Sequence, residues 1–316
     1  MVLWLAACNY ATVDDACRDH VRGESHGSDA AIEVVGRISC YRTFVGLDRG
    51  DIDKKITEAV DAHASYLSTS GQIASTGDWW SESAGTAGYT GVDAFERLYA
   101  SEYLVNDVGS AFVWQVLLPV SDVVTRPELI DLYMDDPFVR DVFLAPAWEG
   151  AGYAEGTDAL IGPFAYMNIV LYYPSGARST RPVVYPQDGQ VDVPTRWTLN
   201  DPGEPAFVGL PPVVGYPITF TFGSSQVSDG ANPLQVSVLD SVITGPSGPV
   251  DHAVALPGVY GTGVNWSTAI LVPSEPLEPL SEYTVEATFQ WIDIDSRKEK
   301  LVFTTADDEA PASSTF

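Results

Sequence analysis

Residues 128–173 constrain the fold more than any other stretch, because the hydrophobic pattern changes within them. Up to Pro137 the apolar residues recur at helical spacing. A glycine-rich turn at 150–153 follows, and then residues 164–173 are apolar on both faces except at Asn168. Such a run predicts a strand that is covered on both sides. Helices packed on both faces of its sheet would make a three-layer arrangement.

Upstream segments carry helical signals. Residues 30–45 place apolar side chains at three- and four-residue steps until Gly46, and residues 52–70 repeat the pattern until Gly71. Residues 125–128 form a capping box with an early proline, which predicts the start of a later helix. The first part of the chain is therefore expected to be largely helical.

Two further helices are expected between these segments. Thr90 is the predicted N-cap of a helix whose apolar face includes Phe95, Leu98 and Tyr103. Residues 107–119 are too apolar for a surface loop and are predicted to form another helix.

The composition changes again after residue 173. Residues 186–212 are rich in proline and glycine and predict an extended connector. Six short β-rich runs then alternate with turn residues, namely 218–222, 234–239, 252–256, 268–272, 283–290 and 301–304. This pattern is typical of an antiparallel sandwich. The spacing of Leu277, Pro279 and Tyr283 resembles the tyrosine corner of immunoglobulin-like and fibronectin-type modules, in which the hydroxyl bonds back to the chain.

Four motifs in the first half together resemble one family. Residues 130–140, IDLYMDDPFVR, resemble the pattern Val-x-x-Trp-Met-x-Ser-Pro-x-His-Arg, and residues 40–47 resemble Asn-x-Tyr-Arg-x-x-x-Gly-Leu. Residues 85–91 are similar to Gly-x-x-Gly-Tyr-Thr-Gly, and residues 61–67 contain a His-Ala-x-Tyr-Leu motif. These segments resemble bacterial members of the CAP superfamily, which comprises cysteine-rich secretory proteins, antigen five and plant pathogenesis-related proteins.

The resemblance implies an α+β protein with a CAP-type α-β-α sandwich, followed by an all-β immunoglobulin-like sandwich. The expected boundaries are 29–185 for the CAP domain, 186–212 for the connector and 213–306 for the second domain. Residues 1–28 are expected to be a truncated lipoprotein signal and a polar tail. Residues 307–316 are expected to be a disordered acidic tail.

The resemblance also indicates where a cleft would lie. Metal-binding members present two histidines and two glutamates, but here Trp80 and Val139 stand at the histidine positions. Glu82, Glu102 and Asp131 remain, with Glu102 expected to keep an inward carboxylate. The sequence therefore predicts no zinc site and no cofactor, and it leaves a weak calcium site with oxygen ligands open.

The cleft is also expected to be rich in aromatic residues. If the resemblance holds, five of them gather near one groove suited to a lipid, glycan or peptide, namely Trp79, Trp80, Tyr89, Tyr133 and Phe138. The alternative is that these rings are plain core. His63 is expected to be a packed helix residue rather than a ligand.

Charge and cysteines indicate the compartment. The 43 acidic and 16 basic residues give a formal charge of −27, which argues against a nucleic-acid partner and against anionic lipid headgroups. Residues 5–8, Leu-Ala-Ala-Cys, resemble a lipobox in which Cys8 would be lipidated; the alternative is a poor N-terminal helix. In an oxidising compartment Cys17 and Cys40 would pair as a disulfide.

Two functions follow as hypotheses. The first is an exported, lipid-anchored, non-enzymatic protein that binds a ligand, glycan or envelope partner at a degenerate cleft. It would be an outer-membrane or cell-surface lipoprotein or a secreted protein, and it would meet the membrane only through its anchor. The alternative is a secreted metal- or carboxylate-dependent hydrolase of envelope material, although no Gly-x-Ser-x-Gly or His-Glu-x-x-His motif is present.

Overall fold

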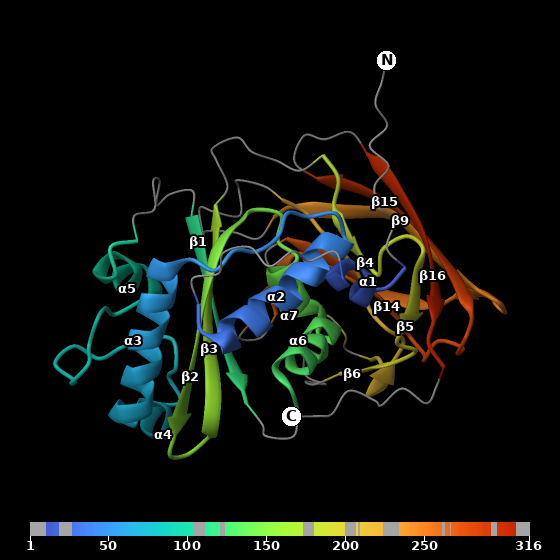
Figure 1. The fold of residues 1–316 in the computed structure, drawn as a ribbon. Helices are drawn as coiled ribbons and strands as arrows, with labels where there is room; N and C mark the ends of the chain where they lie inside the picture. Colours follow the sequence, from blue (N-terminus) through green and yellow to red (C-terminus); the bar gives the residue numbers. More distant parts are fainter. Residues whose placement is uncertain are drawn as a thin grey trace.

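The computed structural model describes residues 11–18, 27–103, 111–120, 124–172, 180–199, 207, 209–223, 234–260, 263–265, 267–291 and 296–307. The fold is a mixed α+β arrangement, in which most described helices precede most described strands (Figure 1). The helices are α1 (Val13–Arg18), α2 (Asp29–Phe44), α3 (Lys54–Ser70), α4 (Gln72–Thr76), α5 (Ala94–Ala100), α6 (Arg126–Asp135) and α7 (Pro137–Phe143).

Within the described residues, the strands form three sheets of three or more strands and two short two-stranded pairs. They are β1 (Ala111–Pro119), β2 (Trp148–Asp158), β3 (Gly162–Tyr172), β4 (Val183–Tyr185), β5 (Gln190–Val193), β6 (Trp197–Thr198), β7 (Val213–Val214), β8 (Ile218–Thr221), β9 (Val236–Gly245), β10 (Gly248–Val250), β11 (His252–Ala255), β12 (Gly258–Tyr260), β13 (Gly263–Asn265), β14 (Thr268–Pro273), β15 (Glu282–Trp291) and β16 (Arg297–Thr305).

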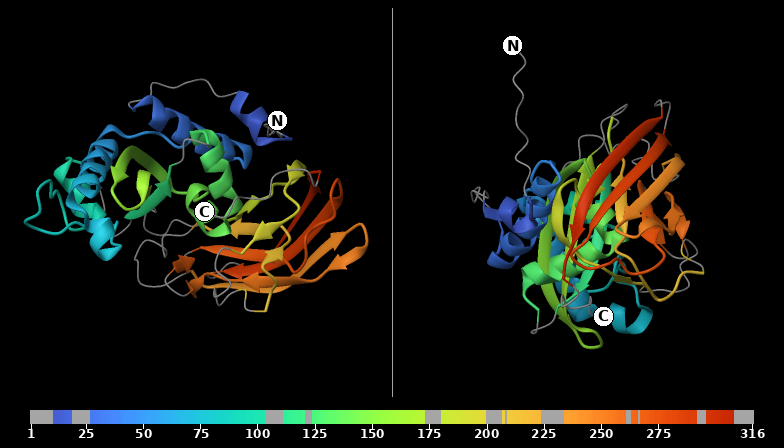
Figure 2. Two further views of the ribbon diagram at one scale, coloured as in Figure 1. Left: turned by 90° about the horizontal axis from the view of Figure 1, so that it is seen from below. Right: turned by 90° about the vertical axis from the view of Figure 1, so that its right-hand side faces the viewer.

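Helices cover both faces of the first sheet, an antiparallel sheet in the order β1-β3-β2. Successive residues of β3 point to opposite faces, so Tyr166 packs in the core shared with α3, whereas Met167 packs in the core shared with α2 and α6. Figure 2 shows the order of the layers: α3 and α5, then the sheet, then α2, α6 and α7. The covered strand predicted at 164–173 is confirmed.

One expected helix is wrong. Residues 111–119, in the run predicted as helical, form β1, and each of them pairs with a residue of β3. An apolar run of this length fits either a buried helix or a strand, and the available partner strand decides the outcome.

One of the two expected helix caps is confirmed. Ser28 and Asp53 cap α2 and α3 through their side chains, and Thr125 forms the expected capping box with Glu128 at α6. Asp93, not Thr90, caps α5. The helix begins at Ala94, later than expected, and the Thr90 side chain is bonded to a buried carboxylate described below.

Two facing sheets make the second half. One has the order β10-β9-β15-β16-β5 and the other β11-β14-β8-β4. The expected tyrosine corner is confirmed, because the Tyr283 hydroxyl accepts a hydrogen bond from the Glu278 N–H at 2.7 Å. The edge strands β4 and β5 come from residues that the sequence assigned to the first domain and the connector.

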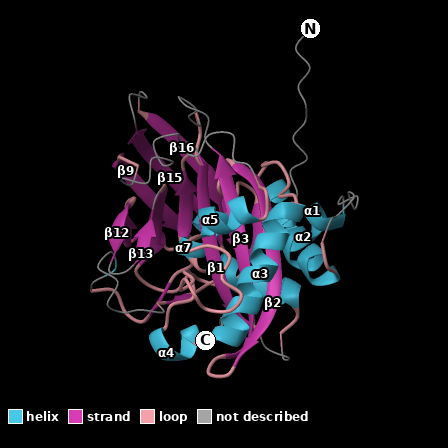
Figure 3. Ribbon diagram, turned by 90° about the vertical axis from the view of Figure 1, so that its left-hand side faces the viewer, coloured by secondary structure: helices cyan, strands magenta, loops and turns pink. Residues whose placement is uncertain are grey.

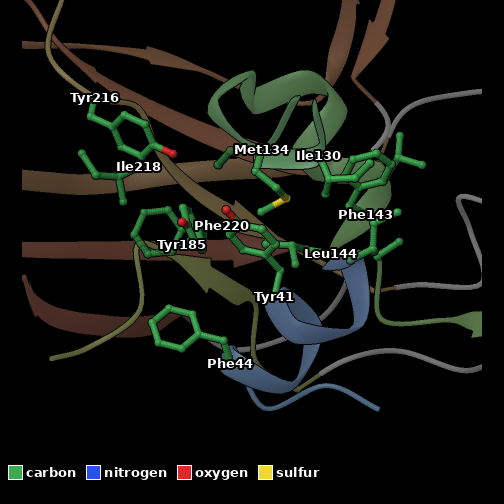
Figure 4. Packing of buried hydrophobic residues seen from close by; sticks show 14 of the residues in the cluster. Tyr41, Phe44, Ile130, Met134, Phe143, Leu144, Tyr185, Tyr216, Ile218 and Phe220 are labelled. Atoms are coloured by element: carbon green, nitrogen blue, oxygen red, sulfur yellow. The ribbon is translucent and has the colours of Figure 1, made fainter. Parts of the chain in front are cut away.

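Helices α6 and α7 join the two halves. The Arg140 side chain is fully buried and donates to the carbonyl oxygens of Met134, in α6, and Pro217, beside β8. Its guanidinium also lies 4.7 Å from the Tyr185 ring centre and 4.9 Å from that of Tyr216. Figure 4 shows apolar residues of α2, α6, α7, β4 and β8 packed together in one core cluster.

The predicted disulfide is present. Cys17 in α1 is bonded to Cys40 in α2. Arg37 adds to this contact by donating to Asp14 of α1 at 2.7 Å. The bond closes the chain across a sequence separation of 23 residues.

Candidate functional site

The structure does not bring the five predicted cleft residues together. Trp80, Glu82 and Glu102 belong to segments that pack on the α3 side of the three-stranded sheet, whereas Asp131 and Val139 lie on α6 and α7, on the other side. The expectation of one shared hollow is therefore wrong, because the sheet itself separates the two groups.

The Glu102 and Asp131 side chains do not face a cleft. The Glu102 side chain is 83% exposed and lies 3.4 Å from the Lys55 ammonium, so its carboxylate does not point inward. Asp131 accepts from Arg37 at 2.6 Å and from the Tyr41 hydroxyl at 2.9 Å, which makes it an anchor for α2 on α6.

The expected gathering of aromatic rings into one groove is also wrong. Phe138 packs near Phe207 and the small core around Trp197, and Tyr133 packs against the core of α2 and α6. Trp79 lies instead against the core of α3 and α5. For these three rings the alternative reading, plain core, describes their surroundings.

A buried histidine–carboxylate pair lies between α3 and the loop 78–91. His63 Nδ1 is 2.9 Å from Glu82 Oε1, and both side chains are buried. Glu82 also accepts from the backbone N–H groups of Thr90 and Gly91 and from the Thr90 hydroxyl. Burial opposes ionisation of Glu82, but the hydrogen bonds from His63 and Thr90 outweigh it and hold its pKa below the ordinary value.

Both nitrogens of His63 are engaged. Nε2 lies 2.9 Å from the Trp79 carbonyl oxygen, while Nδ1 faces the ionised Glu82. Both ring nitrogens therefore contact protein oxygens, and neither is left facing solvent or a ligand. The expectation that His63 is a packed helix residue is confirmed by its burial on α3.

Arg97 of α5 is a buried cation in this region. It is 1% exposed and donates to the carbonyl oxygens of Trp80 and Gly91, to the Tyr166 hydroxyl at 3.3 Å and to Gln115 Oε1 at 2.5 Å. Within the described residues it forms no ion pair at contact distance. Its charge acts on Glu82 only through space, where it helps to lower the pKa of that carboxyl.

These buried groups hold the backbone of the loop. The carbonyl oxygens of Trp79, Trp80 and Ser81 accept, in order, from His63, Arg97 and the Gln72 amide of α4. The Trp80 N–H donates to Asp78 at 3.1 Å. Nearly every polar backbone atom around Trp80 is therefore fixed by a side chain.

Three large apolar side chains are exposed on or next to this loop. Trp80 is 52% exposed, and Tyr89 and Val92 are exposed as well. The loop folds back on itself through a hydrogen bond from the Glu82 N–H to the Val92 carbonyl, and Arg97 links the Trp80 and Gly91 carbonyls. We call Trp80, Tyr89 and Val92 the aromatic surface. Figure 3 views the molecule from the α3 side, where this loop lies.

Three further features bear on the predicted function: the lipidation site, a metal site and a membrane span. Cys8 lies outside the described residues. Among the residues that are described, no group of three or more His, Cys, Asp or Glu side chains is placed to hold a metal ion. No described helix combines the length and the apolar character needed to cross a bilayer.

Sequence reasoning missed most of the buried cluster. The carboxylate that binds His63 comes from 19 residues further along the chain, so helical spacing gave no sign of it. Arg97 and Gln115 carry no motif. Asn168 did give a signal, since it is the one polar residue in an apolar strand.

Comparisons with known proteins add little. No family model and no curated protein matches the sequence. Among solved structures, a crystal structure of PcoC, a methionine-rich copper resistance protein from Escherichia coli, is 19% identical, with a TM-score of 0.24 over 41% of this chain and 99% of the PcoC chain. The selenomethionine form of PcoC is 18% identical, with a TM-score of 0.22 over 39% and 94% of the two chains. Scores this low carry no argument about function.

Proposed function

We propose that this chain is an exported, non-enzymatic protein that binds a neutral glycan of the cell envelope through the aromatic surface. Within this proposal the first half is a degenerate CAP domain and the second an immunoglobulin-like module. A lipid at Cys8 would anchor the chain, so that it acts as an outer-membrane or cell-surface lipoprotein, or it is secreted.

The observation that carries the proposal is the exposed Trp80 indole on a fixed backbone. An exposed aromatic ring normally loses entropy when it is ordered by a ligand, and a backbone already held by His63, Arg97 and Gln72 reduces that cost. Its flat apolar face suits the C–H face of a sugar ring. The neighbouring Asp78 and Glu96 carboxylates can accept hydrogen bonds from hydroxyl groups.

The charge of the chain favours a neutral ligand. A formal charge of −27 repels polyanions such as nucleic acids and anionic lipid surfaces. The geometry of the His63–Glu82 pair favours the non-enzymatic alternative, because the polar atoms of both side chains already contact buried protein groups.

The proposal is tested by cosedimentation of the protein with purified peptidoglycan sacculi. We expect wild-type protein to pellet and Trp80→Ala to remain largely in solution. Leu239→Ala is the matched control, because Leu239 is 55% exposed on β9 and far from the loop in sequence and fold. Equal pelleting of wild type and Trp80→Ala would refute the proposed surface.

A further inference from the structure

The turn between β2 and β3 presents two apolar side chains to solvent. It consists of residues 159–161, which we call the hairpin tip, and it lies at the lower end of the molecule in Figure 1. Leu160 is 67% exposed and its neighbour Ile161 is 42% exposed. In the part of the chain that the structure describes, no other two consecutive large apolar residues are both exposed. Single exposed apolar residues are common, whereas an adjacent pair at the end of a hairpin indicates a contact.

The backbone of the hairpin tip has its hydrogen bonds within the protein. Asp158 Oδ1 accepts from the N–H of Leu160 at 2.7 Å and from the N–H of Ile161 at 3.2 Å, and Asp158 is itself buried. Gly162, with a φ of 78°, closes the turn and pairs with Asp158. A segment whose N–H groups are bonded internally can leave water without losing these bonds. This is the condition for entering an apolar medium.

Charged residues are scarce around the hairpin tip. The Thr157 N–H donates to the Ser68 hydroxyl of α3, and the Val120 N–H donates to the Pro163 carbonyl, so α3 and the end of β1 flank the hairpin. The chain has 43 acidic and 16 basic residues, yet Asp, Glu, Lys and Arg are all absent from the three neighbouring segments, 62–70, 111–120 and 159–172. This end of the molecule is therefore suited to a neutral, apolar partner.

The size of the hairpin tip favours a lipid surface over a protein partner. A stable interface between two proteins buries about 1,200–2,000 Å² in total, which is far more than two side chains supply. Two copies of this chain would also repel each other, because each carries a formal charge of −27. Shallow insertion into a bilayer needs no large area, since each aliphatic side chain that leaves water contributes separately.

We propose that the hairpin tip inserts into the surface of a zwitterionic lipid bilayer, with Leu160 and Ile161 at the boundary between headgroups and acyl chains. The contact is additional to the lipid expected at Cys8, and it does not depend on the aromatic surface. Zwitterionic headgroups carry no net charge, so an acidic chain can approach them, whereas anionic headgroups repel it. A contact of two side chains is weak and reversible, and it acts together with an anchor.

The test is cosedimentation with phosphatidylcholine vesicles. It uses the full chain with Cys8→Ser, so that no acyl chain contributes to binding. We expect this protein to bind, and Leu160→Asp in the same background to lower the partition coefficient at least about tenfold. Ile161→Asp is a second variant of the tip and should act in the same direction. Leu239→Asp is the matched control, since it places the same charge at an exposed leucine of β9, and it should leave the partition coefficient unchanged.

Three results would overturn the inference. They are no binding of the Cys8→Ser protein to phosphatidylcholine vesicles, equal partition coefficients for Leu160→Asp and Leu239→Asp, and tighter binding when half of the lipid is phosphatidylglycerol. Sedimentation velocity tests the other occupant, because a dimer that Leu160→Asp dissociates would show that a second copy covers the tip, and this too would overturn the inference. The proposed function stands or falls separately, since Leu160→Asp should still pellet with sacculi through Trp80.

Discussion

At the scale of single residues, the molecule uses buried charge to fix a surface loop. His63, Glu82 and Arg97 are all buried; His63 bonds to Glu82 and to the Trp79 carbonyl, and Arg97 bonds to the Trp80 carbonyl. The Trp79 ring adds an apolar contact with the core of α3 and α5. The conformation of the loop depends on this polar network. Disrupting the network lowers stability, because the group that loses its hydrogen-bond partner remains buried.

Removing either residue of the His63–Glu82 pair should therefore lower the stability of the protein substantially. We expect His63→Ala to lower the free energy of unfolding by about 3 kcal/mol, because the buried Glu82 loses its side-chain partner on α3 and keeps only Thr90 and Gly91. Urea denaturation measures the change.

Glu286→Ala is the comparison, since this carboxylate pairs with Lys298 and Lys300 on the exposed face of a sheet. It should cost less than about 1 kcal/mol. A loss at His63 no larger than the loss at Glu286 would mean that the buried pair does not hold the loop.

The sequence anticipated part of this site. It indicated that His63 is packed on its helix and that Asn168 interrupts an apolar strand. It placed Glu102 inward because of a motif match, but Glu102 has a positive φ of 64° and a side chain turned to solvent. Pairings between distant segments, such as Glu82 with His63, depend on tertiary packing that no local pattern records.

At the scale of elements, α6 and α7 dock on the second half through buried polar groups. Arg140 bonds to Pro217, Asp135 accepts from the Tyr216 hydroxyl at 3.0 Å, and Asp141 accepts from the Ser267 hydroxyl at 3.0 Å. Burial raises the pKa of Asp135 to about 6, against the opposing effects of Arg140 and the Tyr216 hydrogen bond. Burial likewise raises the pKa of Asp141 to about 6, against the hydrogen bonds from Thr268 and Ser267.

This contact should make stability depend on pH. A carboxyl whose pKa is higher in the folded protein contributes stability that is full below the unfolded pKa of about 4 and is lost as pH rises through about 6. We expect the free energy of unfolding to fall between pH 4 and pH 7. In Asp141→Asn the fall should be smaller by about 1–3 kcal/mol, as urea denaturation across this range would show. A slope unchanged by Asp141→Asn would contradict the assignment.

Arg140 makes a separate prediction for the same contact. Arg140→Lys should lower the free energy of unfolding by about 2–4 kcal/mol, because an ammonium cannot bond to the Met134 and Pro217 carbonyls together while stacking on two rings. Arg126→Lys, at an exposed ion pair, is the matched control and should change little. Equal effects in denaturant titrations would argue against a special role for Arg140.

At the scale of the whole molecule, the sequence did not predict which strands lie at the edges of the two facing sheets. The six runs after residue 213 were predicted well, since alternation and turn residues are local signals. The edge strands β4 and β5 were not, because they are short and their residues pair with strands over 30 and 100 residues away. The helix expected at 107–119 failed for the same reason, as its strand partner comes later in the chain.

The disulfide joins α1 to α2. Reduction of Cys17–Cys40 should lower the free energy of unfolding by about 3 kcal/mol, because it releases a closed loop in the unfolded chain. Hydrogen exchange of α1 should rise in the reduced protein while exchange in β3 stays slow. Unchanged protection of α1 would show that its contacts with α2 suffice without the bond.

The central claim is that the fixed loop around Trp80 binds envelope glycan without cleaving it. The most direct measurement incubates the protein with peptidoglycan sacculi and records two quantities from each tube: the protein that pellets and the sugar fragments released into solution. The account predicts that wild-type protein pellets, that Trp80→Ala does not, and that no tube releases more fragments than sacculi alone. Release of fragments by wild-type protein that disappears in Glu82→Gln would contradict it and establish the hydrolase.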